Sequence, residues 1–162
     1  MATSDSIAIK RAAADTADWQ AVLDLVLQAF AYMEERNDPP SSAHRLTVEA
    51  MIAQTEEGAV FIAEGRDDTL LGCVFLKPKG DALYLGKLAI RPARQGEGIG
   101  RRLFEATIEE ARARNLPEIE LQARVELTEN HAVFAAMGFR EVGRTAHDGY
   151  NRPTSVTMRY TI

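Results

Sequence analysis

Apolar positions along the chain follow two different periods, and the changes of period divide it into strands and helices. Alternating apolar and polar residues predict a first strand over residues 6–11. Apolar residues then recur at helical spacing, which predicts a helix over residues 18–34 that Asp15 or Asp18 caps. Two prolines within residues 37–42 predict that the chain breaks there.

A second helix is predicted to begin near Leu46, with Ala50, Met51 and Ala53 on one side, and to end at Gly58. After it the chain is rich in short β-favouring runs separated by turn residues, among them a turn over 78–81. These runs predict strands over residues 60–64, 70–77, 82–90, 118–123, 139–144 and 155–160.

Two further helices are predicted within the second half of the chain. The first covers residues 98–114 and has its apolar residues, Ile99 to Ala111, on one side. It connects the strands over 82–90 and 118–123, which must then be parallel. The second is capped by Thr128 and ends at Gly138, so the pattern as a whole predicts a mixed α/β fold.

Three glycines, Gly96, Gly98 and Gly100, stand where the helix over 98–114 begins. Glycine permits positive φ and leaves no Cβ in the way of a ligand, and the first N–H groups of a helix lack partners within it. Helix N-termini therefore bind anions such as a pyrophosphate. The local charge agrees, because five cations lie nearby against one acid: Lys87, Arg91, Arg94, Arg101 and Arg102, against Glu97.

The glycine spacing differs from the two commonest phosphate loops. A P-loop has Gly-Lys followed by Ser or Thr, whereas Arg101-Arg102 follow Gly100 here. A Rossmann turn has G-x-G-x-x-G after the first strand, whereas this turn has G-x-G-x-G after several strands.

The sequence Gln95-Gly96-Glu97-Gly98-Ile99-Gly100 resembles the Q/R-x-x-G-x-G/A motif of the GNAT acetyltransferase superfamily, and Leu88-Ala89-Ile90-Arg91-Pro92 resembles the strand that leads into it. The resemblance continues more weakly over nearly the whole chain. It implies a single domain over residues 1–162 of the α+β (mixed α/β) class. The fold would have a central, mostly antiparallel sheet of six to seven strands, with one parallel pair splayed at the cofactor site and about four flanking helices.

The resemblance also implies acetyl-CoA as the acyl donor and assigns its binding residues. The N–H groups from Gln95 to Arg101 would hold the pyrophosphate, and the main chain of Leu88 to Ile90 would hold the pantetheine arm and stabilise the oxyanion. Asn130 would contact the cofactor arm. The implied cofactor-binding residues are Leu88, Ala89, Ile90, Gln95, Gly96, Glu97, Gly98, Ile99, Gly100, Arg101, Asn130 and Phe134.

At one position the chain departs from the common form of that family. Phe134 matches a tyrosine that in many members donates a proton to the leaving thiolate, and phenylalanine cannot donate. Either another group donates the proton, for which Tyr150 on the loop between the last two strands is the candidate, or no donor is needed because a thiolate is already a fair leaving group. Glu126, Glu34 and Glu35 are weaker candidates for the base, since each also fits a solvated surface acid. An acceptor pocket is expected from Tyr32, Met33, Pro39, Pro40 and Ser41.

Composition restricts the function further. The 162 residues carry a net charge of −5, which argues against a general nucleic-acid binder. No apolar run approaches the ~20 residues that span a bilayer, and residues 1–6 lack the features of a signal peptide. The single cysteine, Cys73, is expected to be a buried hydrophobic residue, and no metal site is indicated. We expect the protein in the cytoplasm, with neither a nucleic acid nor a membrane as its partner. Many members of the family that it resembles pair as dimers, so a homodimer is the candidate assembly.

The leading hypothesis is an N-acetyltransferase in which a small-molecule or peptide amine attacks acetyl-CoA directly. Three alternatives stay open: a CoA-binding module without turnover, an acyltransferase with a longer donor or a hydroxyl acceptor, and a protein that binds ATP with the same turn. The acceptor itself cannot be identified from the sequence.

Overall fold

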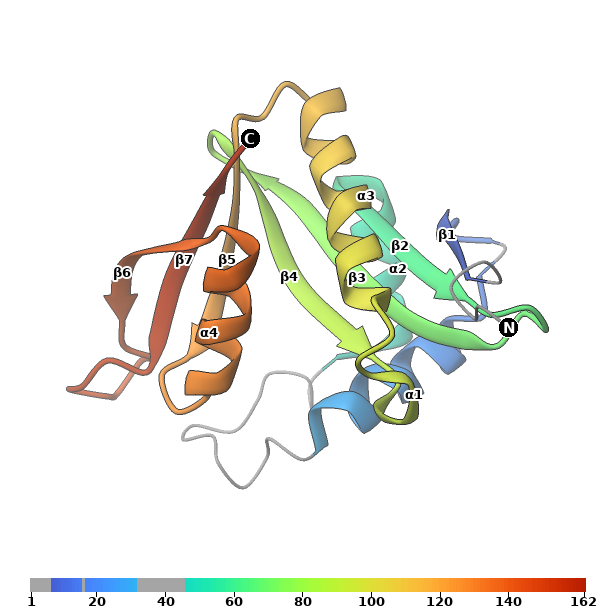
Figure 1. Cartoon of the computed structure of the whole chain (residues 1–162), viewed down its shortest axis with the longest axis horizontal. Helices are drawn as coiled ribbons and strands as arrows, with labels where there is room; N and C mark the ends of the chain where they lie inside the picture. Colours follow the sequence, from blue (N-terminus) through green and yellow to red (C-terminus); the bar gives the residue numbers. More distant parts are fainter. Residues whose placement is uncertain (1–6, 16, 32–45) are drawn as a thin grey trace.

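The computed structural model describes residues 7–15, 17–31 and 46–162, in which seven strands form one sheet and four α-helices cover its two faces (Figure 1). The strand order is β1-β2-β3-β4-β5-β7-β6. The elements are β1 Ala8–Arg11, α1 Trp19–Phe30, α2 Val48–Glu57, β2 Ala59–Glu64, β3 Leu70–Lys79, β4 Ala82–Ile90, the 3-10 helix Pro92–Arg94, α3 Ile99–Ala113, β5 Glu118–Arg124, α4 Thr128–Met137, β6 Arg140–Thr145 and β7 Ser155–Thr161. This architecture confirms the expected mixed α/β fold.

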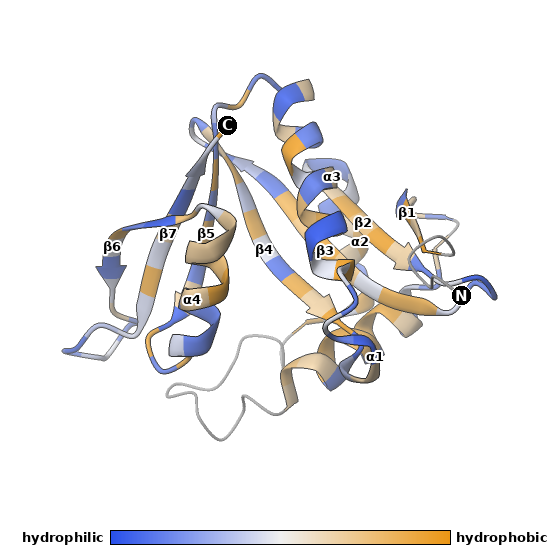
Figure 2. Ribbon diagram, in the orientation of Figure 1, coloured by the Kyte–Doolittle hydropathy of each residue, from blue (hydrophilic) through white to orange (hydrophobic). Residues whose placement is uncertain are grey.

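Each face of the sheet has its own hydrophobic core. On one face α3 packs against the sheet through Ile99, Leu103 and Ala111, all buried. On the other face α1 and α2 cover a second core that contains Trp19 and Met51. Figure 2 shows strong hydrophobic colouring on β2, β3 and the end of β4, whereas much of β6 and the outer side of α3 are hydrophilic. The sheet is therefore a middle layer between two pairs of helices.

Strands β4 and β5 form the only parallel pair of the described sheet, and the pairing is short. It runs from Ala82 opposite Glu118 to Leu85 opposite Leu121 and then stops. Beyond Leu85, β4 continues to Ile90 with β3 as its neighbour on the other side, and the two strands diverge (Figure 1). The far half of β4 therefore has one open edge inside the sheet, as expected for a splayed parallel pair.

A β-bulge lies at the point where the two strands part. Leu85 is opposite Leu76 of β3, but Lys87 is opposite Phe75, so Gly86 is an extra residue in β4. A bulge bends its strand and increases its twist, and we attribute the departure of β4 from β5 to this bend. The bulge also changes the alternation: Leu85, Leu88 and Ile90 all lie toward α3, and Ala89 lies toward α1.

The sequence-based element boundaries differ from the structure in a few places. Strand β3 includes Pro78, which was expected in a turn. The pairing of β3 with β2 ends at Leu76, so Pro78, which has no N–H, does not have to donate a hydrogen bond to β2. Thr128 was expected to cap α4 but is its first residue, with Leu127 at the cap position. In α2 only Met51 is fully buried, whereas Ala50 and Ala53 are exposed.

In α1, Asp18 is the N-cap as expected, and the helix extends to Phe30. The part of the expected helix over residues 32–34 lies outside the described residues. Among the described helices, none combines the length and apolar character needed to cross a membrane.

A close main-chain contact positions α2 over β3. Gly58 follows the last turn of α2, and a Cβ built there would lie 1.9 Å from the carbonyl oxygen of Leu76. We expect Gly58→Ala to lower the free energy of unfolding by about 2 kcal/mol or more, because main-chain atoms of β3 would have to move. Urea denaturation followed by circular dichroism measures this change.

The matched control for that experiment is Gly143→Ala on β6. A Cβ there meets no atom within 4 Å, so stability should change by less than about 0.5 kcal/mol. If both variants were as stable as the original protein, the close approach of α2 to β3 would be wrong.

Candidate active site

A pocket of about 420 Å³ lies where the open edge of β4 meets the beginning of α3 and one side of α4. Leu88 and Ile90 contribute from β4, and Gln95, Gly100 and Arg101 contribute from the glycine turn and the first turn of α3. The remaining lining residues come from the end of α1 and from one side of α4: Ala29, Phe30, Asn130, Val133, Phe134 and Met137. Its size is within the usual range for a small-molecule site.

The N-terminus of α3 is left open by the protein. The side chains of Asp18 and Thr47 cap α1 and α2, each accepting a hydrogen bond of 3.1 Å from a main-chain N–H. The N-cap of α3 is Gly98, which has no side chain to do this. Arg102 is the first residue whose N–H bonds back, to Gly98 O at 3.1 Å, and within the described chain the N–H groups of residues 96–101 find no main-chain acceptor.

The turn before α3 depends on glycine. Gly96 and Gly98 have φ of 87° and 82°, which side chains other than glycine rarely adopt. A Cβ at either position would meet nothing within 4 Å, so the loop is open on its outer side. Gly100 has ordinary helical geometry, and a Cβ there would lie 3.9 Å from Ile90 Cδ1, within the pocket lining.

Main-chain groups of β4 also face the pocket. The N–H of Arg91 donates to Leu71 O of β3 at 2.8 Å. In an antiparallel pair alternate residues bond to the partner strand, so Ala89 also faces β3, and the N–H and C=O groups of Leu88 and Ile90 point to the open edge. The pocket therefore has two sources of unpaired main-chain donors: the strand edge and the helix N-terminus.

The basic cluster that the sequence indicated is not gathered at the pocket. The guanidinium of Arg91 donates to Leu70 O at 2.8 Å and that of Arg102 to Ile7 O at 2.6 Å, so both help to hold the fold. Lys87 lies on the opposite face of β4, as its place in another pocket shows. Their nearness in sequence had suggested that these cations share a role in binding an anion. The side-chain alternation along β4 and these bonds to carbonyl groups direct them elsewhere.

Arg94 and Glu97 form a bidentate ion pair, with both N–O distances at 2.8 Å. This pair lowers the pKa of Glu97 through its hydrogen bonds with Arg94, which keeps the carboxylate charged and paired. Of the five cations only Arg101 lines the pocket, where it is exposed.

The structure brings seven of the expected cofactor-binding residues together around the pocket. These are Leu88, Ile90, Gln95, Gly100, Arg101, Asn130 and Phe134. Ala89 is buried toward α1 and is not among them, and the side chain of Ile99 is buried in the core under α3, so only its N–H is available. The ring of Phe134 packs against Phe139 with centroids 5.7 Å apart.

The sequence did not indicate the contributions of Ala29, Phe30, Val133 and Met137 to the pocket. Val133 is 57% exposed, although it is a large apolar residue. Apolar residues at helical spacing on the exposed side of α4 are the sequence signal that would have indicated that this helix lines a binding pocket.

The candidate catalytic groups lie on two loops near the end of β5. Tyr150 is half-buried between β6 and β7, with the Arg152 guanidinium 5.3 Å from its ring centre, and it lines neither described pocket. Glu126 is half-buried in the loop before α4. Burial lowers the pKa of the neighbouring His147, with a further contribution from the charge of Arg124.

Several expected site residues cannot be placed, because they lie outside the described residues. They are the candidate bases Glu34 and Glu35 and the acceptor-pocket candidates Tyr32, Met33, Pro39, Pro40 and Ser41.

Comparison with protein families gives a match over residues 19–139 to the model described as the acetyltransferase (GNAT) family. The match covers most of the chain, including the open strand edge and the glycine turn. The chain belongs to the GNAT acetyltransferase family. It is an acyltransferase, and acetyl-CoA is its acyl donor, which confirms the resemblance seen in the sequence.

Individual relatives of this GNAT enzyme are distant. An IAA acetyltransferase of Azospirillum brasilense is 26% identical over 125 residues, covering 76% of this chain and 79% of the relative. An aminoglycoside N(6')-acetyltransferase type 1 of Stenotrophomonas maltophilia is 30% identical over 100 residues, covering 56% and 65%. The crystal structure of the PaiA N-acetyltransferase from Thermoplasma acidophilum, in complex with coenzyme A, has a TM-score of 0.78 at 15% identity over 97% of this chain and 99% of that one.

The one cysteine of the GNAT enzyme is part of the core. Cys73 is completely buried in β3, and burial raises the pKa of its thiol to about 12. A thiol that is both inaccessible and protonated is not a nucleophile, which agrees with the expectation from the sequence.

We expect Cys73 of the folded protein to resist a thiol-disulfide reagent at mildly alkaline pH and to react fully after unfolding in guanidinium chloride. The absorbance of the released aromatic thiolate measures both rates. Fast labelling of the folded protein would contradict the burial of Cys73. Because Cys73 would not react in the folded protein, the same reagent can be used to measure the thiol of released CoA.

Proposed function

We propose that this acetyltransferase transfers the acetyl group of acetyl-CoA to a primary amine by direct attack, without a covalent enzyme intermediate. The observation that supports this most is that an open strand edge and an uncapped helix N-terminus meet in the same pocket. Such a pocket suits an extended donor with an anionic end, and a cytoplasmic location would supply acetyl-CoA.

The N-terminus of α3 would hold the pyrophosphate. The N–H groups of residues 96–101 have no main-chain partner within the described chain, and the helix dipole adds attraction for an anion. Arg101 would add a full positive charge at the rim of the pocket. Because Arg94 already pairs with Glu97, the acid in this turn repels the phosphates less than its sequence position suggests.

The edge of β4 would hold the pantetheine arm and orient the thioester. Leu88 and Ile90 direct their N–H and C=O groups to the pocket, so the amides of the arm would extend the sheet as a partial strand. When the amine nitrogen attacks the thioester carbon, its oxygen becomes an oxyanion, and one of these N–H groups would donate to it. The C–S bond then breaks, and the thiolate leaves.

Two protons must move during the reaction. The amine loses one, for which Glu126 is the candidate acceptor directly or through water. The thiolate gains one, and Tyr150 is the candidate donor because Phe134 has no hydroxyl group. In this proposal Phe134 shapes the pocket through its packing on Phe139.

The proposal is tested by incubating the protein with acetyl-CoA and a panel of primary amines while free thiol is measured. Amine-dependent thiol release with a stoichiometric acetylated product is expected. Calorimetric binding of CoA without release on any amine would instead favour a CoA-binding module. Tight binding of ATP with no affinity for CoA would contradict the assignment of the pocket.

We expect Gly100→Val to raise the dissociation constant of CoA by more than about tenfold, because the new side chain would enter the pocket that Gly100 lines. Isothermal titration calorimetry measures this constant. Gly100 is a better test than Gly98, where positive φ would strain any side chain. Ala113→Val is the control, since it adds a branched side chain at the exposed far end of the same helix. Unchanged CoA binding by Gly100→Val would contradict the placement.

We expect Tyr150→Phe to lower kcat by about a hundredfold with little change in the KM for acetyl-CoA, since a general acid typically contributes this much. Steady-state thiol release measures both constants. The double variant Tyr150→Phe/Phe134→Tyr returns a hydroxyl group to the pocket and should recover part of the loss. A kcat that Tyr150→Phe leaves unchanged would exclude Tyr150 as the proton donor.

A further inference from the structure

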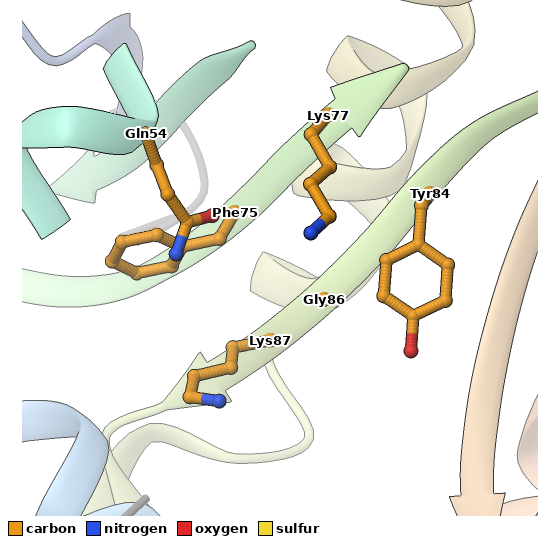
Figure 3. A pocket seen from close by; sticks show the side chains of 6 residues that line it. All are labelled: Gln54, Phe75, Lys77, Tyr84, Gly86 and Lys87. Carbon is orange, nitrogen blue, oxygen red and sulfur yellow. The ribbon is translucent and has the colours of Figure 1, made fainter. Parts of the chain in front are cut away.

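A second pocket, of about 250 Å³, lies on the face of the sheet that α1 and α2 cover (Figure 3). It is lined by residues of β3, β4 and α2: Gln54, Phe75, Lys77, Tyr84, Gly86 and Lys87. Figure 3 shows Gln54 of α2 overlapping Phe75 in this view, with the side chains of Lys77, Tyr84 and Lys87 spaced along strands β3 and β4. Of these residues, only Lys87 belongs to the basic cluster that the sequence indicated.

This second pocket is next to the open edge of β4. Gly86 is the first residue of β4 beyond the last pair with β5, and it forms part of the pocket wall. The bulge at Gly86 also brings Tyr84 and Lys87 to the same face, although they are three residues apart. A thioester lying along Leu88 and Ile90 would therefore have this pocket beside it, on the opposite face of β4 from the main pocket.

The charges around the second pocket do not cancel. Among the described residues no carboxylate pairs with Lys77 or Lys87, although other lysines and arginines of the same sheet, such as Lys10, Lys79 and Arg140, each pair with a glutamate. The nearest buried acid, Glu120, is already shared by Lys79 and Arg159, with N–O distances of 2.6 Å and 2.9 Å. The pocket therefore presents two ammonium groups that lack a counter-charge within the described chain.

Burial adds to the demand for an anion. It lowers the pKa of Lys87, which means that the charged ammonium is under-solvated where it stands. Burial, with a contribution from the Glu120 carboxylate, raises the pKa of Tyr84, so its phenol stays protonated and can donate a hydrogen bond. An anion in this pocket would meet two ammonium groups, a phenol and the amide of Gln54.

We propose that this second pocket binds the acceptor and that the acceptor is a small amine carrying a carboxylate group. The inference rests on the proposed function and specifies its substrate class. Lys87 would bind the carboxylate, with Lys77 and Tyr84 around it, and Gly86 would leave the way open for the amine to reach the thioester. Polycationic amines are disfavoured, because the lysines would repel them.

Matched acceptors test the charge requirement. Amino acids with a terminal amine and three to six carbons are compared with their amides, which keep the amine but lack the carboxylate. The carboxylates should have the higher kcat/KM by about tenfold or more, as expected for a hydrogen-bonded charge pair. A peptide with a free N-terminus and an acidic second residue tests whether a peptide carboxylate is also accepted. Equal rates for acids and amides, or faster acetylation of spermidine, would overturn the proposal.

Variants of Lys87 then test whether the acceptor carboxylate binds in the second pocket. Lys87→Met should reduce the ratio of kcat/KM for acid over amide by about tenfold, and Lys87→Arg should keep most of the ratio. Lys10→Met, on β1 at the far edge of the sheet, is the control and should leave the ratio unchanged. A ratio that Lys87→Met does not lower would show that the carboxylate binds elsewhere.

A binding experiment separates this inference from the proposed function. The CoA-loaded protein is treated with an amine-modifying reagent, and modification of Lys87 is quantified by mass spectrometry. The amino acid should protect Lys87 and its amide should not. Protection without any acetylation would support the anion pocket while contradicting the transferase mechanism, whereas acetylation of amines without protection would do the reverse.

Discussion

The parting of β4 from β5 is the constraint around which the rest of the structure is arranged. Strands in the middle of a sheet normally bond on both sides, because a buried N–H or C=O group without a partner is costly. Here β4 bonds on one side only beyond Leu85, and a pocket occupies the other side. A ligand that supplies alternating amide groups would complete the sheet, so main-chain groups would contribute to its binding alongside side chains.

The two pockets lie beside the open edge of β4, one on each face of the sheet. The larger one is bounded by α3 and α4 and is mostly apolar apart from main-chain groups and the side chains of Gln95, Arg101 and Asn130. The smaller one, toward α2, is polar and basic. A donor and an acceptor approaching from opposite faces would meet at the edge of β4, where neither has to pass the other.

Much of the fold could be predicted from the sequence, because apolar periodicity and turn residues determine the elements one at a time. The glycines at 96, 98 and 100 also indicated the uncapped start of α3, since positive φ and the absence of a capping side chain are local properties. The distribution of charge could not be predicted in the same way. Arg91 and Arg102 are near the turn in sequence, but each donates to a carbonyl group that is distant along the chain.

Strand β4 shows why the other residues of the two pockets could not be predicted from the sequence. Strict alternation over residues 82–90 would place Lys87 and Ala89 with Leu83 and Leu85, and the bulge places them on the other face. Likewise, Phe30 and Met137 meet at one pocket through tertiary packing alone, although more than half of the chain separates them. Neither fact has a signal in a local pattern.

The extra residue in β4 has a consequence for how such a sheet can arise or be lost. If Gly86 were deleted, Leu85 would be followed directly by Lys87, and all later side chains would keep their present faces. The ladder would become regular, the strand would straighten, and β4 could stay beside β5 beyond Leu85. A single codon would therefore separate a continuous sheet from one with an open edge, with no change in either hydrophobic core.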